Sequence, residues 1–114
     1  MRTTQQYHRL VTRLCKSSER EAKALMRVLP AEIRERVAGV TIRFMDKPTP
    51  AMIERGTRDD ALSVTDREAG EIIVFVMNLN DRYAAVLGAF REELKRVLVT
   101  ELAEWAGTEW VGQD

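Results

Sequence analysis

Residues 90–110 read FREELKRVLVTELAEWAGTEW and predict the helix around which the chain folds. Apolar side chains recur in and just before this stretch at steps of three and four residues, the spacing of one buried helical face. On a wheel of about 100° per residue, Glu101 falls inside that apolar stripe, between Val97 and Trp105. A carboxylate there must be paired, protonated or functional, because burying it without a partner is costly. The stripe consists of Leu87, Phe90, Leu94, Val97, Leu98, Leu102 and Trp105.

The composition is that of one small globular protein without a strong overall charge. The chain has 114 residues, with 18 basic and 18 acidic side chains and a formal net charge of zero. We therefore expect a single domain over residues 1–114 and no general attraction to nucleic acid or to an anionic membrane. The chain has no apolar run of membrane-spanning length, and residues 1–10 lack the apolar core of a signal peptide. These features predict a cytoplasmic location.

Histidine and cysteine are scarce, which limits the metal sites that the chain can build. His8 is the only histidine and Cys15 the only cysteine. Neither a two-histidine zinc site nor a thiolate cluster can therefore form within one chain. Any intrachain metal site would consist mostly of carboxylates, which suits calcium, magnesium or manganese better than zinc. Cys15 lies on an apolar helical face, where we expect a small buried thiol.

The first third of the chain is predicted to be helical. Apolar residues keep helical spacing from residue 3 to residue 29. Ser18 and Glu21 form the S-x-x-E pattern that caps a new helix, so one long helix and a break or kink at the serines both remain open. We favour the break. Pro30 then predicts a short helix over residues 30–37, because proline suits the first helical position, and Gly39 ends it.

The middle of the chain alternates between strand and turn signals. Residues 40–45 alternate as a half-buried strand, and residues 51–55 form one helical turn. Residues 61–65 are a short strand that a turn over residues 66–70 joins to the uninterrupted apolar run 71–77. That run predicts a central strand buried on both faces, paired with its predecessor in a hairpin.

A further helix and the last helix complete the predicted fold. Asn78 or Asn80 can cap a helix over residues 81–87, and the last helix runs from about Ala89 to Ala106. The order of elements predicts an α+β fold: a small, mostly antiparallel sheet with helices packed on one face.

Four landmarks in this order resemble those of a known protein family. They are LPAEIR at residues 29–34, VTI at 40–42, IIVFVMNL at 72–79 and ELKRVLV at 93–99. Over residues 25–107 the chain is similar to the small bacterial zincin-like proteins, which have a minimal zincin fold. In that family the last helix carries HExxHxxGxxD. The resemblance implies two imidazoles that hold zinc and a glutamate that polarises the bound water.

The aligned segment of this chain keeps little of that motif. Residues 100–107 read TELAEWAG, so Glu101 takes the general-base position and Gly107 the turn-glycine position. Thr100 and Glu104 stand where the family has histidines, and Trp110 stands where it has the third ligand. Threonine is not a useful zinc ligand here and tryptophan cannot be one. We therefore expect no metal and no cofactor, although the family implies zinc.

Two functions follow from the resemblance. The first is a non-catalytic binding or scaffolding module for an unidentified protein or peptide. That partner would bind in the former active-site groove or on an exposed sheet edge. The alternative is a hydrolase in which Glu101 acts as general base at a carboxylate metal site with Glu104 and either Glu109 or Asp114. If Glu101 has only a structural role, we expect a partly buried acid paired with an arginine.

Overall fold

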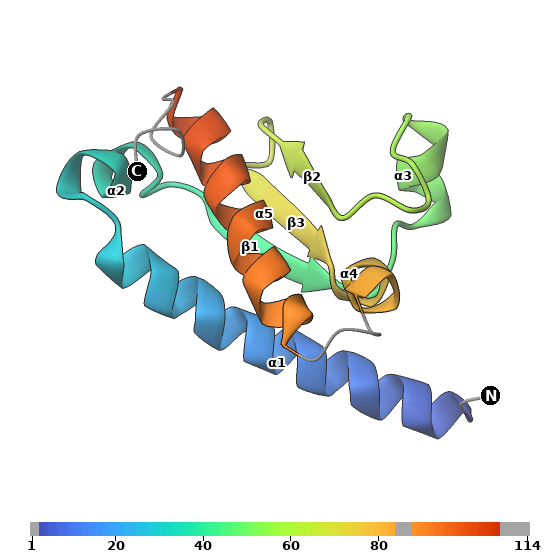
Figure 1. Ribbon diagram of the computed structural model, residues 1–114. Coiled ribbons are helices and arrows are strands. Elements are labelled where there is room, and N and C mark those ends of the chain that lie inside the picture. The colour runs from blue at the N-terminus through green and yellow to red at the C-terminus, as the bar shows by residue number, and fades with distance from the viewer. Residues whose placement is uncertain (1–2, 84–87, 108–114) are drawn as a thin grey trace.

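The α+β class predicted from the sequence is confirmed. Figure 1 shows the protein as a computed structural model, which describes residues 3–83 and 88–107. Within these ranges the elements are α1 (Thr4–Val28), α2 (Ala31–Arg36), β1 (Thr41–Met45), α3 (Pro50–Glu54), β2 (Ser63–Asp66), β3 (Glu71–Phe75), α4 (Val76–Tyr83) and α5 (Ala89–Ala106). The strands make one sheet, and α5 crosses over it while α1 runs along one side (Figure 1).

The sheet is mixed, not mostly antiparallel as the sequence suggested. Its order is β1-β3-β2, so the last strand of the chain lies in the centre. β1 pairs with β3 in parallel, with Ile42 opposite Ile72, and β2 pairs with β3 antiparallel, with Val64 opposite Ile73. The physical reason is that β3 is the most apolar strand. The central position buries it best, with β2 beside it through the hairpin and β1 paired to its other edge.

β3 is buried on both faces, as its apolar sequence predicted. Ile72 and Val74 belong to the core beneath the helices, while Ile73 and Phe75 alternate to the other face and are also buried. The strand ends at Phe75, however, and Val76 and Met77 already belong to α4. The prediction that the strand reaches residue 77 is wrong, because an apolar run has no period that separates a buried strand from a buried helix.

α1 is one continuous helix of 25 residues, so the break favoured at the serines is wrong. The capping box belongs to its true start, where Thr3 Oγ1 accepts from Gln6 N and Gln6 Oε1 accepts from Thr3 N. Ser18 lies on the buried line of the helix, one turn from the buried Ala22. Packing of this face keeps the helix intact through the serines. No helix in the two described ranges has both the length and the apolar character needed to cross a membrane.

α4 and α5 carry most of the remaining core. Asn78 and Asn80 were predicted to cap a helix, but both lie inside α4; residues 84–87 of that predicted helix lie outside the described residues. Glycines with positive φ cap α5 at both ends, Gly88 at 82° and Gly107 at 70°. The buried residues of α5 pack on the same face of the sheet as the buried residues of α1 and α2. The core cluster comprises Ala22, Leu29, Ile33, Val37, Ile72, Val74, Leu79, Leu94, Val97, Leu98 and Leu102.

A buried hydroxyl in α1 gives a stability prediction. Ser18 Oγ is fully buried and has no hydrogen-bond partner among the described residues. Ser18→Ala should raise the free energy of unfolding by about 1 kcal/mol, measured by urea denaturation, because a buried unsatisfied hydroxyl destabilises the folded state. The control is Ser17→Ala, which makes the same change at a half-buried neighbour on the same helix. A Ser18→Ala variant less stable than Ser17→Ala would contradict this interpretation.

Candidate functional site

Glu101 is half-buried on α5 and is held by a residue of β2. Glu101 Oε2 accepts a hydrogen bond from Thr65 Oγ1 at 2.6 Å. Thr65 pairs with Ile72 of β3, so its side chain projects from the sheet face that packs under the helices. The distance is that of a hydroxyl bound to a carboxylate, which is stronger than a bond between neutral groups. The predicted arginine partner is therefore replaced by a threonine.

Of the other motif positions, the structure describes Thr100 and Glu104 on α5 and Gly107 directly after it. Thr100 and Glu104 are exposed, and Trp110 lies outside the described residues, as do Glu109 and Asp114. Within residues 3–83 and 88–107, no three His, Cys, Asp or Glu side chains are grouped so that they could share a metal ion. Among the described residues, the Glu101 carboxylate has the Thr65 hydroxyl as its hydrogen-bond partner.

Two arginines hold the carboxyl-terminal end of α5. Arg67 Nη2 donates to the Glu104 carbonyl oxygen at 3.2 Å, and the Arg67 guanidinium carbon lies 4.9 Å from the Trp105 ring centroid. Arg36 Nη1 donates to the Ala106 carbonyl oxygen at 3.4 Å. Cations at this end complement the partial negative charge of the helix and its unpaired carbonyl groups. This end of α5 is thus fixed structurally to the turn after β2 and to α2.

The outer edge of β2 lies beside this site. Phe75 N donates to the Leu62 carbonyl oxygen at 2.9 Å, which makes Leu62 and Phe75 a hydrogen-bonded antiparallel pair. Hydrogen-bonded and non-hydrogen-bonded pairs alternate along such a ladder, so the backbone N–H and C=O groups of Val64 also point toward β3. The backbone N–H and C=O groups of Ser63 and Thr65 then point away from β3. Because β2 is an edge strand, these groups face outward from the sheet.

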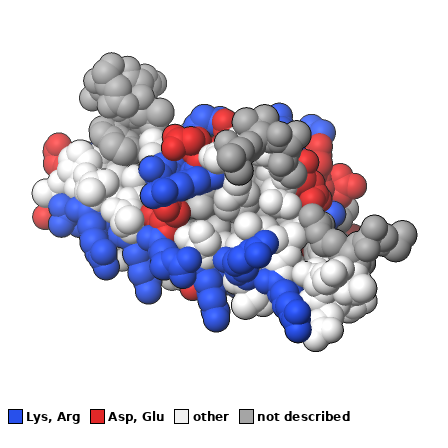
Figure 2. All heavy atoms as spheres, turned by 60° about the horizontal axis from the view of Figure 1, so that its bottom comes forward, with Lys and Arg blue, Asp and Glu red and all other residues white. Residues whose placement is uncertain are grey.

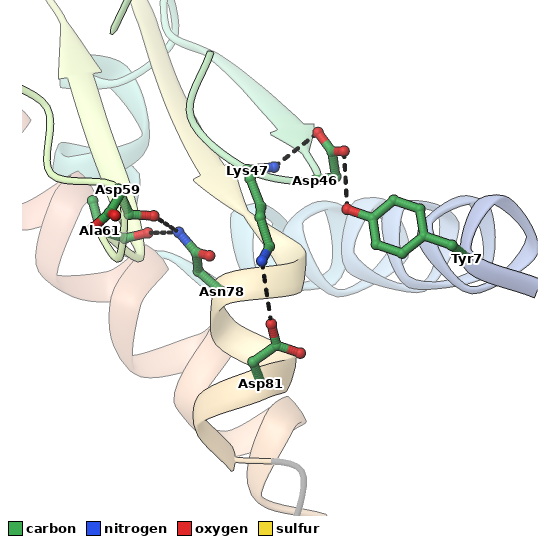
Figure 3. Close-up of polar contacts among 7 residues, drawn as sticks. All are labelled: Tyr7, Asp46, Lys47, Asp59, Ala61, Asn78 and Asp81. Atoms are coloured by element: carbon green, nitrogen blue, oxygen red, sulfur yellow. Dashed lines mark hydrogen bonds and ion pairs between the residues drawn. The ribbon is translucent and has the colours of Figure 1, made fainter. Parts of the chain in front are cut away.

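A second polar region lies at the other end of the sheet (Figure 3). Asn78 Nδ2 donates to the carbonyl oxygens of Asp59 and Ala61, each at 2.8 Å. Lys47 Nζ lies 3.6 Å from Asp81 Oδ2, so a second contact joins the segment after β1 to α4. These contacts fasten the long connection between β1 and β2 onto α4.

This region borders a polar depression whose charges balance. The depression has a volume of about 830 Å³, and both cations and acids line it. Arg58 pairs with Asp60 and Lys47 pairs with Asp81, so two of the cations are already neutralised by neighbours. A surface with both signs of charge in pairs favours no ligand charge. We interpret it as a structural junction.

His8 and Cys15 both lie on α1. His8 is exposed and its ring meets the edge of the Tyr7 ring, 6.1 Å between centroids. Cys15 is half-buried, and its Sγ donates to the Phe44 carbonyl oxygen at 3.8 Å. Burial, together with Glu19 and Asp46 nearby, raises the pKa of the Cys15 thiol. The Cys15 thiol was predicted to be buried, and the structure shows it half-buried.

Sequence reasoning missed two residues that hold the site and its surroundings together. Thr65 had been assigned only to a strand, and Asn78 only to a helix cap. The alternation of residues 61–65 does place Thr65 on one face of the strand, but its opposite partner depends on register with β3. Asn78 follows the predicted end of β3, which the sequence placed two residues too late. Its side chain reaches the Asp59 and Ala61 carbonyl groups because α4 already begins at Val76.

The contact between β2 and α5 can be tested by a double-mutant cycle of Thr65→Val and Glu101→Leu, in which the leucine removes the acceptor. Threonine and valine have nearly the same shape, so Thr65→Val removes the donor while preserving the strand. We expect a coupling energy of about 1 kcal/mol by chemical denaturation, because the hydrogen bond is charge-assisted but only half-buried. Additive effects of the two substitutions would show that the contact contributes nothing to stability.

The role of Asn78 can be tested against a matched residue of the same helix. Asn78→Ala should lower the free energy of unfolding by about 1–2 kcal/mol, because it leaves two backbone carbonyls without their donor. Amide hydrogen exchange at Ala61, whose N–H donates to the Arg58 carbonyl oxygen, should also become faster. Asn80→Ala is the control, since Asn80 is also half-buried on α4 but makes neither contact. Equal effects at both positions would refute a specific anchor.

Comparison with known proteins does not extend these assignments. The chain matches no protein-family model, no curated protein and no solved structure. The structure itself establishes an α+β fold with a three-stranded mixed sheet in its described part. The likeness to the minimal zincin-like proteins remains a prediction that rests on the sequence landmarks.

Proposed function

We propose that this protein is a non-catalytic binding module, related to the minimal zincin-like proteins, that holds an extended peptide on the outer edge of β2. The observation that carries the proposal is the outward direction of the Ser63 and Thr65 backbone groups beside α5. An edge strand with free N–H and C=O groups accepts a further strand by main-chain hydrogen bonds. The proposal therefore needs no metal and no cofactor.

The residues at the motif positions support a function without catalysis. Thr100 and Glu104 replace the two imidazoles that would hold zinc, and the chain has a single histidine on a different helix. Glu101 has one carboxylate oxygen engaged by the Thr65 hydroxyl at 2.6 Å. A general base must reach a bound water or substrate proton at hydrogen-bond distance. The Thr65 contact instead gives this carboxylate a structural partner.

The hydrogen bond between Thr65 and Glu101 also supports a preference for certain side chains in the bound peptide. A strand added to β2 would direct alternate side chains toward the face that carries Thr65 and Glu101. The second carboxylate oxygen of Glu101 remains a hydrogen-bond acceptor, since a carboxylate can accept several bonds. A lysine, arginine or hydroxyl-bearing residue in the peptide would satisfy it. The expected ligand is therefore an extended peptide with a hydrogen-bond donor at that position.

Panning a displayed library of random peptides against the whole protein tests the proposal. We expect enriched peptides whose binding falls about tenfold on Ser63→Pro, because proline removes an outward N–H without touching the bonds to β3. Ser63→Ala is the matched control, because it removes the hydroxyl but keeps the N–H, and it should bind normally. Circular dichroism and melting temperature confirm that both variants fold.

Two results would overturn this proposal. The first is enriched peptides that bind Ser63→Pro as well as the unmodified protein, or no enrichment at all. The second is a stoichiometric metal in protein purified without a histidine tag that disappears in Glu101→Gln or Glu104→Gln. That metal, with peptide cleavage lost in the same variants, would establish the hydrolase alternative.

A further inference from the structure

The outward face of α1 carries a regular line of cations. Steps of four and three residues separate them, so they recur once per helical turn. On a wheel of about 100° per residue, all six lie within about 40° of the line opposite the buried Ser18. Glu19 and Glu21, the two acids of α1, both lie outside that arc. The α1 cationic face consists of Arg9, Arg13, Lys16, Arg20, Lys23 and Arg27.

These side chains are free to meet a ligand. All six are exposed, and within the described parts of the chain none forms an ion pair. Figure 2, in which α1 is turned toward the viewer, shows Lys and Arg side chains projecting in a row along this side of the molecule. By contrast, Arg43, Lys47, Arg58, Arg91 and Arg96 each have an acidic partner. The six cations of α1 are therefore not paired with acids in the described parts of the chain.

A net charge of zero hides this separation of charge. α1 contains six cations and two acids, so it carries four net positive charges. The rest of the neutral chain must carry four net negative charges. The expectation that nucleic acid is not a partner came from the sum over the chain. Association depends on the local potential over the surface, to which α1 contributes four net positive charges.

The shape of this face suits a long, linear anion. From residue 9 to residue 27 the cations extend over about 27 Å at 1.5 Å per residue. The surface along residues 4–20 is hollowed by a shallow depression of about 870 Å³, which Arg9, Arg13, Lys16 and Arg20 line together with Thr12 and His8. The cations thus follow one straight line with hydrogen-bonding groups between them. A point anion would engage only one or two of them.

We propose that the α1 cationic face binds the sugar-phosphate backbone of a nucleic acid. Four of the six cations are arginines, whose planar guanidinium groups bind phosphate oxygens with two hydrogen bonds. Gln5 and Thr12 are also exposed there and supply neutral donors of the kind that contact phosphates and sugars. Six evenly spaced phosphate contacts give sequence-independent binding in which released counterions supply much of the affinity.

A membrane surface fits this face less well. Helices that lie in a bilayer interface place large apolar or aromatic side chains on the side that meets the lipid. Large apolar side chains of α1, such as Leu25 and Met26, instead pack against the core of the protein. Val28 is exposed, but it is the last residue of α1 and lies to one side of the cations. An anionic bilayer would bind this face through electrostatic attraction alone, without burial of apolar side chains.

The test measures binding of labelled nucleic acids to the whole protein by fluorescence anisotropy at several salt concentrations. One probe is a DNA duplex of about 20 base pairs, longer than the roughly 8 base pairs that 27 Å spans. The other is a single strand of the same length. The central variant is Arg13→Gln with Lys16→Gln and Arg20→Gln. The control is Arg55→Gln with Arg58→Gln and Arg82→Gln, which removes the same charge from exposed positions elsewhere.

With six phosphate contacts, affinity for the duplex should fall about a thousandfold between about 50 and about 200 mM salt. The central variant should lose only about fortyfold over that range, as three contacts predict, and should bind more weakly at the lower salt. The control triple should keep the steep dependence of the unmodified protein. Tighter binding of either the duplex or the single strand supports the proposal and identifies the form that the face prefers.

Three results would overturn the proposal. One is the absence of binding to both nucleic acids at low salt. Another is an equal loss in the central and control variants, which would show a response to net charge alone. The third is stronger binding to other polyanions, tested with poly-glutamate and with phosphatidylcholine vesicles containing phosphatidylglycerol. Preference for either of these would assign the face to an acidic protein or to a membrane.

Discussion

Burial of β3 on both faces is the constraint on which the rest of the structure depends. Its side chains alternate between two buried environments, so the strand needs neighbours on both sides and helices above it. Only the central position of the sheet provides this, and β1 and β2 thereby become the two edges. The direct passage from Phe75 into α4 follows from the same burial, because Val76 and Met77 are also covered. The placement of β3 fixes which surfaces remain available for binding.

Much of this fold could be predicted because periodicity is a local property. β1 and α5 were found from spacing alone, since each has one buried face, and the hairpin was found from the turn residues between its two strands. The end of β3 was misplaced because a wholly apolar segment has no period. The serines in α1 were misread because a capping pattern and a buried serine look the same until the packing of the helix is known. Local signals fail where tertiary burial overrides them.

The candidate site was predictable in part, for a related reason. Glu101 stood out because a carboxylate inside an apolar stripe is a local anomaly. Its partner Thr65 is 36 residues away, and the contact depends on the register between β2 and β3, which no single segment encodes. The line of cations on α1, in contrast, could have been read from the sequence. Its spacing of three and four residues is visible there, whereas the zero net charge is a sum over the chain that does not show it.

The two surfaces lie at opposite edges of the sheet. α1 is tied to β1 through the Cys15 contact with the Phe44 carbonyl, whereas α5 is tied to β2 through Glu101 and Thr65. β3 stands between these edges. A peptide on β2 and a phosphate backbone on α1 would therefore occupy separate surfaces and would not compete for the same residues. Because α1 carries four net positive charges, a nucleic acid bound as proposed would be oriented toward α1 before contact. If both proposals hold, one protein would bring a peptide and a nucleic acid together, each on its own surface.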